Sequence, residues 1–231
     1  MLFLGVSLWC VGILKKQDWL AAAGLALTTV RPHLCLTLAI PFCFRYRKVW
    51  WRFMIIAGLL TLTSIFLLEQ KGTLDYINIL RISANGNWYG MNESSMLNLI
   101  GLIWRIYPLT DPRIIHSISW FGYLTGIGLV SFLWVKSREL DGRLLGASII
   151  IALLFAPHLH FHDLALLIIP LIFAIRIPIP NISPQQISLL PLIISLVFLF
   201  EPMRYILPYG LYAALFWWLI KINPKQTQVH G

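Results

Sequence analysis

Long apolar runs, separated by short basic or proline-containing breaks, dominate the order of residues along the chain. Runs that suit membrane-crossing helices lie at about 50–68, 114–135, 186–200 and 205–220. The apolar residues run continuously instead of alternating with polar ones, which favours helices over membrane strands. The pattern therefore predicts an all-α, polytopic transmembrane helical bundle that forms a single membrane domain over residues 1–231.

Several of the remaining apolar runs are short or broken. Residues 1–14 would form a helix of roughly 21 Å, against about 30 Å of hydrocarbon in a bilayer. Residues 19–44 are apolar except at Arg31 and its neighbours, where Pro32 disfavours helix at the residue before it. The segment is then either two half-helices that meet at Arg31 or one kinked span. Two more short helices are expected, one ending at Pro157 and the other near Arg176.

Lysine and arginine are distributed unevenly between the two sides that this layout defines. By the positive-inside rule the more basic side is cytoplasmic. The C-terminus is then cytoplasmic, and the polar stretch 69–112 is an extracytoplasmic loop of a multi-pass plasma-membrane protein. The basic residues expected inside are Lys15, Lys16, Arg45, Arg47, Lys48, Arg52, Lys136, Arg138, Arg143, Arg176, Lys221 and Lys225. Those expected outside are Lys71, Arg81, Arg105, Arg113 and Arg204.

Composition agrees with an integral membrane protein, since 58% of the residues are hydrophobic, 12% are charged and the mean hydropathy is +0.78. The formal charge of +9 could suit nucleic acid, but the basic residues stand at the ends of apolar runs, where topology explains them. The lipid bilayer is therefore an expected partner and nucleic acid is not. Cys10, Cys35 and Cys43 form no paired motif and are expected to behave as small hydrophobic residues.

A cluster of ionisable residues interrupts the apolar sequence LFAPHLHFHDLALLIIP, in which His158, His160, His162 and Asp163 stand together. Ionisable groups at membrane depth are costly unless they face protein or water, so the cluster predicts a site. It could be a phosphate or sugar site, or a structural network that caps broken helices. It could also be a metal site, if an extended chain placed the three imidazoles on one face. A helical path would instead put His158 and His162 together and His160 opposite.

Three motifs carry a resemblance to a known family. LTTVRPHLCLTLAIPFCFRYRKVWWR has a small-residue helix, a basic residue with proline, an apolar run and a basic cluster. NESSMLNLIGLIWRI has Asn, a polar residue and Ser before a short helix that ends in Arg. The third is the Pro-His-x-x-x-x-Asp sequence that begins at Pro157. In this order and spacing, over roughly residues 15–220, they resemble the C-terminal portion of glycosyltransferase family 87.

The resemblance implies a GT-C-like fold and the transfer of a hexose, such as mannose, from a polyprenyl-phosphate sugar to an extracytoplasmic acceptor of unknown identity. In an inverting transfer a carboxylate removes the acceptor proton while the lipid phosphate departs with growing negative charge. Cations and hydrogen-bond donors in a dry site stabilise that charge, with no metal or other cofactor required. The implied substrate-binding residues are Arg31, His33, Asn92, Ser94, His158, His160, His162 and Asp163.

Two of these assignments have structural alternatives. Arg31 could reach the membrane surface with its charged end or cap the backbone instead of binding a ligand. Asn92, Glu93 and Ser94 could be ordinary loop residues or a helix cap.

The catalytic base is the open part of this assignment. Enzymes of the GT-C class carry an acidic residue in the first extracytoplasmic loop, and no such loop stands before Lys15. Asp18 lies in a basic turn, so Asp75, Glu93 and Asp111 are the remaining candidates. We therefore expect the chain as given to bind donor lipid but to transfer no sugar. The alternative function is a non-enzymatic polytopic membrane protein, either transporter-like or a remnant that binds lipid phosphate.

Overall fold

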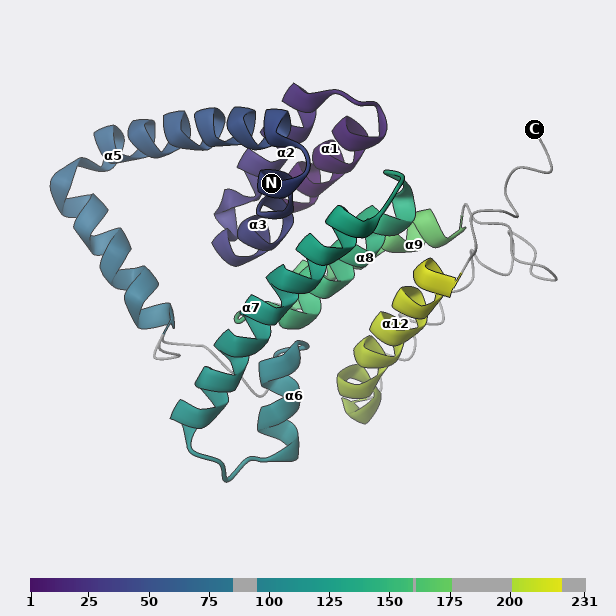
Figure 1. The fold of residues 1–231 in the computed structure, drawn as a ribbon. Coiled ribbons are helices and arrows are strands. Elements are labelled where there is room, and N and C mark those ends of the chain that lie inside the picture. The colour runs from purple at the N-terminus through teal and green to yellow at the C-terminus, as the bar shows by residue number, and fades with distance from the viewer. Residues whose placement is uncertain (85–94, 160, 176–200, 222–231) are drawn as a thin grey trace, which may run out of the picture.

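The computed structural model describes residues 1–84, 95–159, 161–175 and 201–221, and every regular element in these ranges is a helix (Figure 1). The elements are α1 (Leu2–Leu14), α2 (Asp18–Leu27), the 3-10 turn η1 (Thr28–Val30), α3 (Pro32–Ala39), α4 (Pro41–Phe44), α5 (Arg47–Ala84), α6 (Leu99–Ile106), α7 (Pro112–Lys136), α8 (Gly142–Phe155), the 3-10 helix η3 (Phe161–Leu167), α9 (Ile168–Ile175) and α12 (Glu201–Lys221).

Helices α1 and α2 form a tight antiparallel hairpin, because glycines let the two backbones touch. A Cβ atom added at Gly12 would stand 2.3 Å from the backbone nitrogen of Ala21. One added at Gly24 would stand 2.3 Å from the backbone nitrogen of Trp9. Small residues at helix interfaces allow this kind of close approach between apolar helices. The hairpin therefore depends on the absence of side chains at these two glycines.

The chain turns back on itself at Arg31, so that α3 returns beside α2 and α4 packs against α7. Arg31 has φ −126° and ψ 82°, outside the helical region, and α3 begins at the next residue. The Sγ atom of Cys35 in α3 lies 3.5 Å from the carbonyl oxygen of Leu25 in α2. Farther along, Arg52 in α5 pairs with Asp18 at the start of α2, with 2.8 Å between Nη1 and Oδ2. The two ends of the segment thus meet on one side, which is the half-helix arrangement and not a single kinked span.

An aromatic cluster forms the core at the end of the molecule where α2 starts. Trp9, Phe42 and Trp134 are fully buried there, and the rings of Phe42 and Trp134 have centroids 4.6 Å apart. The indole Nε1 of Trp134 donates to Ser148 Oγ at 2.9 Å, which ties α7 to α8. The guanidinium of Arg45 donates to the carbonyl oxygens of Trp134 and Ser137, so it caps the last turn of α7. The core therefore joins α1, α4, α7 and α8.

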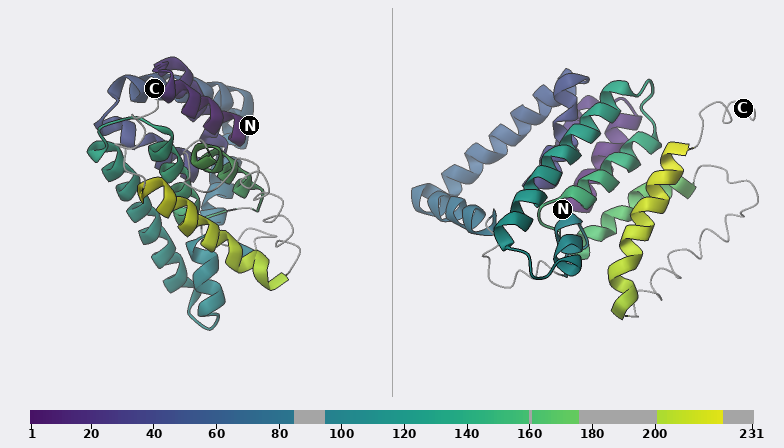
Figure 2. Two further views of the ribbon diagram at one scale, coloured as in Figure 1. Left: turned by 90° about the vertical axis from the view of Figure 1, so that its right-hand side faces the viewer. Right: turned by 60° about the horizontal axis from the view of Figure 1, so that its bottom comes forward.

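Helices α7 and α8 run antiparallel, with α9 and α12 packed against α8 (Figure 2). Gly126 in α7 gives room to the Phe155 side chain at the end of α8. After α8 the chain leaves the helical path at Ala156 and Pro157 and resumes as η3. A second chain break therefore lies beside the middle of α7.

Helix α5 leaves this body as an exposed arm with a sharp bend (Figure 1). The bend is at Glu69, whose φ of 56° and ψ of −175° interrupt the helix. Two helices in the described ranges are long and apolar enough to cross a membrane, the segment Arg47–Ile82 of α5 and Pro112–Lys136. In the most apolar window of the first, only 6% of the residues are buried inside the protein, against 33% in the second. The apolar surface of the arm is thus largely uncovered by the chain itself.

The predicted elements compare well with those of the structure where both can be read. The all-helical class is confirmed for the described residues, and the predicted helices at 50–68 and 114–135 lie within α5 and α7. The stretch 69–112 is more helical than its polar composition predicts, because α5 continues after Glu69 and α6 follows. The span predicted at 186–200 lies outside the described residues. The one at 205–220 lies within α12.

Replacing Gly24 by alanine should destabilise the protein by about 2–3 kcal/mol, because the new methyl group meets backbone atoms that cannot move aside. Gly128→Ala is the matched control, since a Cβ atom there meets nothing within 4 Å. It should leave stability unchanged or raise it by up to about 1 kcal/mol through helix propensity. Thermal unfolding in detergent, followed by tryptophan fluorescence, measures both. Equal stability of the two variants would contradict the close packing of α1 on α2.

Candidate functional site

The helical path is interrupted at Arg31 and again after α8, at Ala156 and Pro157. The side chain of Arg31 joins these two helix breaks. Its Nε lies 3.4 Å from Oδ1 of Asp163, in an ion pair whose side chains are 25% and 1% exposed. Its Nη2 lies 2.8 Å from Nε2 of His162. Arginine has only donors, so Nε2 of His162 is the acceptor of this hydrogen bond. A residue of the first break thus binds two consecutive residues after the second.

The carboxylate of Asp163 is the structural anchor of this group. The distance of 3.7 Å between its Oδ1 and Nε2 of His162 is too long for a hydrogen bond, and Nε of Arg31 lies closer to the same oxygen, at 3.4 Å. A carboxylate taken out of water is costly unless a cation pairs with it. Asp163 therefore holds Arg31 in position, while the exposed His162 ring stands at the edge.

Two further histidines, His33 and His158, stand close in sequence to Arg31 and Asp163. The rings of His33 and His158 face each other edge to face, with centroids 6.4 Å apart. The carbonyl oxygen of His33 accepts hydrogen bonds from Tyr123 Oη at 2.8 Å and Thr37 Oγ1 at 3.0 Å. Tyr123 stands near the midpoint of α7, so the backbone of His33, two residues after the break at Arg31, lies beside the middle of that helix. Five of the residues predicted from sequence therefore make contacts across the two breaks, namely Arg31, His33, His158, His162 and Asp163.

The described geometry leaves hydrogen-bonding capacity for an anion. Arginine carries five N–H donors, and the contacts to Asp163 and His162 use one on Nε and one on Nη2. Guanidinium N–H donors match the oxygens of an anion such as phosphate, and such contacts gain strength where water is scarce. The ion pair supplies orientation, and the other donors supply binding capacity.

A network of polar side chains outside the predicted site holds the second break in place. Asn98 is fully buried, and its Nδ2 donates to the carbonyl oxygen of Ala156 at 2.7 Å, directly before Pro157. Tyr209 Oη donates to the carbonyl oxygen of Asn98 at 2.8 Å, and Arg105 Nη2 donates to Tyr209 Oη at 2.6 Å. The network links α6, α12 and the end of α8.

Sequence reasoning missed this network, although one local signal was available. Asn98 precedes the apolar run of α6, and its Oδ1 accepts from the backbone N–H of Gly101 at 3.1 Å as a helix cap does. The partners Ala156 and Tyr209 are distant in sequence, so no local pattern indicates them.

Of the three acidic residues considered as bases, two lie within the described residues and one does not. Asp111 caps α7, and its Oδ1 accepts from the backbone N–H of Arg113 at 2.8 Å. Asp75 is exposed on the α5 arm. The predicted residues Asn92, Glu93, Ser94 and His160 lie outside the described part of the chain.

Within the described residues, no group of three or more His, Cys, Asp and Glu side chains is arranged to hold a metal ion. The three-imidazole alternative needs His160, which these residues do not include. His158 and His162 have separate partners, the first beside His33 and the second at Arg31.

Comparison with known proteins adds no relative, since no protein-family model, no curated protein and no solved structure matches this chain. In the ranges described, the chain is all-helical, has two helices long and apolar enough to cross a membrane, and joins two breaks in its helical path by an ion pair whose carboxylate is buried.

The coupling between Arg31 and Asp163 can be measured with a double-mutant cycle. Arg31→Gln leaves the buried carboxylate without its cation and should lower the free energy of unfolding by about 3 kcal/mol. Adding Asp163→Asn should recover a large part of that loss, giving a coupling energy of about 2 kcal/mol. The control cycle uses Arg52→Gln and Asp18→Asn, a pair about 30% exposed, where the coupling should stay below about 1 kcal/mol. Equal coupling in the two cycles would contradict an anchoring role for Asp163.

Proposed function

We propose that the chain is part of a membrane glycosyltransferase and that the group around Arg31 binds the phosphate of a polyprenyl-phosphate hexose. The observation that carries the proposal is the position of the Arg31–Asp163 pair at two facing chain breaks halfway along α7. Ionisable side chains at membrane depth usually mark a site for a ligand or an ion. A lipid phosphate is an anion that enters from the bilayer, which suits this position.

The choice of arginine supports phosphate over a neutral ligand. A guanidinium keeps its charge and presents a planar set of donors that matches phosphate oxygens. Asp163 fixes one edge of that plane, so Arg31 would meet the ligand with little loss of side-chain freedom. His33 and His158 would donate to the same phosphate and stabilise the charge that grows as the sugar leaves.

Transfer of the sugar is a separate step that needs a carboxylate to remove the acceptor proton. Asp163 is not assigned this role, because it is 1% exposed and paired with Arg31. Asp75, Glu93 and Asp111 remain the candidates for the base. The rival function, a non-enzymatic protein that binds lipid phosphate, would use the same donors without a base. Both functions therefore predict binding of the donor lipid, and only the glycosyltransferase predicts transfer of the sugar.

Donor binding should depend on the cluster and need no added metal. Arg31→Gln and His158→Ala should each weaken binding of a polyprenyl phosphate by roughly ten- to a hundredfold, the value of one charge-assisted contact of about 1.5–3 kcal/mol. Arg31→Lys keeps the charge but loses the planar set of donors, so it should give an intermediate value. Binding to the purified chain is followed with a fluorescent polyprenyl phosphate.

His116→Ala is the control of the same residue type, because His116 lies near the start of α7, about two helical turns before Tyr123. It should bind the lipid as the unchanged chain does. Loss of binding in His116→Ala, or full binding in Arg31→Gln with folding intact, would contradict the phosphate site. Incubation with a radiolabelled polyprenyl-phosphate hexose and a membrane lipid extract then tests transfer. Binding without transfer is the result expected of the chain as given, whereas robust transfer would contradict the non-enzymatic rival.

The proposal also requires the cluster to open toward the outside of the cell. The basic residues around the start of α5 and the end of α7 predict that this end faces the cytoplasm. Single cysteines at Arg138 and Arg113, in a chain without Cys10, Cys35 and Cys43, should differ in labelling by an impermeant thiol reagent in intact cells. Arg113→Cys should react and Arg138→Cys should not. The reverse pattern would place the lipid-phosphate site against the wrong side and rule out this donor.

A further inference from the structure

The end of the molecule opposite the start of α7 carries a strongly positively charged surface, which we name the basic end. It is made of residues from three separate stretches of the chain, and all of them are exposed. Its members are Lys15, Lys16, Arg47, Lys48, Lys136 and Arg138. The cluster around Arg31 contributes nothing to this surface.

Two internal contacts bring the three stretches together. The Asp18–Arg52 pair joins the turn after α1 to the start of α5. Arg45 donates to the carbonyl oxygens of Trp134, Ser137 and Arg138, which joins the start of α5 to the end of α7. Since Asp18 is already paired with Arg52, it does not neutralise the basic end. The six cations therefore form one surface, with Glu139 as the exposed acidic neighbour.

Large exposed aromatic side chains stand between these cations. Trp19, Phe44 and Trp51 are 55%, 61% and 64% exposed. The guanidinium of Arg52 lies 5.0 Å from the ring centroid of Trp19. Tryptophan beside lysine and arginine is typical of the boundary between hydrocarbon and headgroups. The apolar, exposed part of α5 continues directly from this surface, so a ligand of the basic end must share its boundary with an apolar medium.

We infer that the basic end binds the anionic headgroups of phospholipids. Clusters of four to eight lysines and arginines next to a membrane helix attract anionic lipid, each charge contributing about a fivefold factor in binding. Nucleic acid offers the same charge, but it offers no apolar neighbour for Trp19, Trp51 and the α5 arm. The inference does not depend on what the Arg31 cluster binds.

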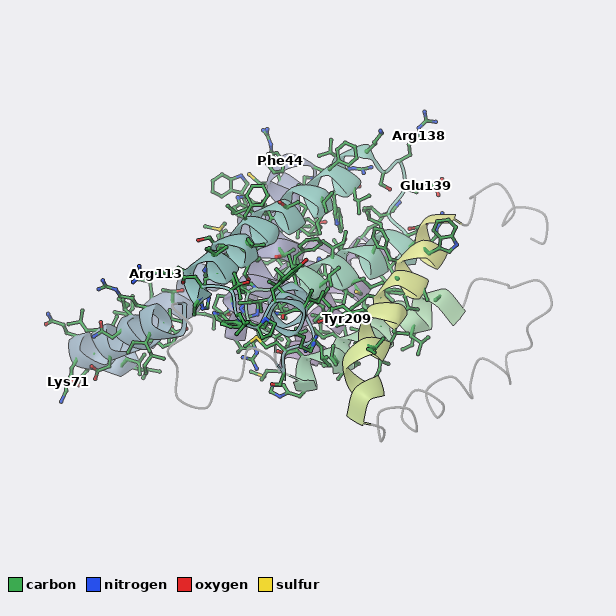
Figure 3. The ribbon with its side chains drawn as sticks, turned by 90° about the horizontal axis from the view of Figure 1, so that it is seen from below. Phe44, Lys71, Arg113, Arg138, Glu139 and Tyr209 are labelled. Carbon is green, nitrogen blue, oxygen red and sulfur yellow. The ribbon has the colours of Figure 1, made fainter. Side chains whose placement is uncertain are left out.

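The test compares two triple variants of the full chain, delipidated in a non-ionic detergent. Lys15→Gln, Arg47→Gln and Lys48→Gln together remove half of the basic end. Lys71→Gln, Arg81→Gln and Arg113→Gln together remove three exposed charges elsewhere, and Figure 3 shows Lys71 and Arg113 far from Arg138. Each chain is titrated with phosphatidylglycerol or phosphatidylcholine, and retained lipid is counted by native mass spectrometry. Circular dichroism melts verify that each variant folds.

The unchanged chain should bind phosphatidylglycerol at least about a hundredfold more tightly than phosphatidylcholine. The first triple should lose about a hundredfold in phosphatidylglycerol affinity, because it removes three charges worth about fivefold each, and the second should stay within about twofold. Raising salt from about 0.15 M to about 0.5 M should weaken the binding, because exposed charges are screened. Equal affinity for the two lipids, or equal losses in the two triples, would overturn the inference. Binding of labelled duplex DNA as tight as phosphatidylglycerol would overturn it in favour of a nucleic-acid partner.

Discussion

The ion pair between Arg31 and Asp163 is the interaction on which the rest of the arrangement depends. It joins residues 132 positions apart in the sequence, at two points where the helical path is broken. A buried carboxylate is unfavourable without a cation, so the two breaks have to face each other once the apolar helices have packed. Whether such a pair adds net stability is secondary, because its main effect is to fix which segments meet. The orientation of Arg31 for a ligand follows from the same contact.

The short helices around the pair have a common geometric reason. Helices α1, α2 and α8 contain 13, 10 and 14 residues, which gives about 15–21 Å each at 1.5 Å per residue. Helices of this length reach about half or two thirds of the hydrocarbon thickness from one side. Their packing has to be close, which is why Gly12 and Gly24 lie against backbone. Close packing and a polar site therefore have the same cause, which is the use of short, broken helices. Such helices bring free backbone groups and polar side chains to the same depth.

The sequence predicts the local features well and the pairings poorly. Proline acts on the residue before it, so the break at Arg31 and the end of α8 near Pro157 can be read directly from the order of residues. The apolar lengths likewise predict the helices at 50–68 and 114–135. Asp163 as the partner of Arg31, and Ala156 as the partner of Asn98, depend on tertiary packing that no local pattern contains. The helix after Glu69 was missed for a related reason, since its mixed composition resembles a loop until the helix geometry separates the residues into faces.

The fold-back of residues 18–52 is the central claim, because it places Arg31 inside the molecule and both ends of the segment on one side. A short bifunctional thiol reagent applied to cysteines at Asp18 and Arg52, in a chain without its native cysteines, tests it most directly. The contact of 2.8 Å between the ends of these two side chains predicts efficient cross-linking in native membranes by a reagent that spans about 10 Å, because the long arginine side chain bridges more than the roughly 7 Å between Cα atoms that a direct disulfide allows. A pair at Asp18 and Arg113 should not cross-link and serves as the control. Failure of the Asp18–Arg52 pair to cross-link, with thiol labelling of the two positions from opposite sides of the membrane, would contradict the fold-back and show a single kinked span.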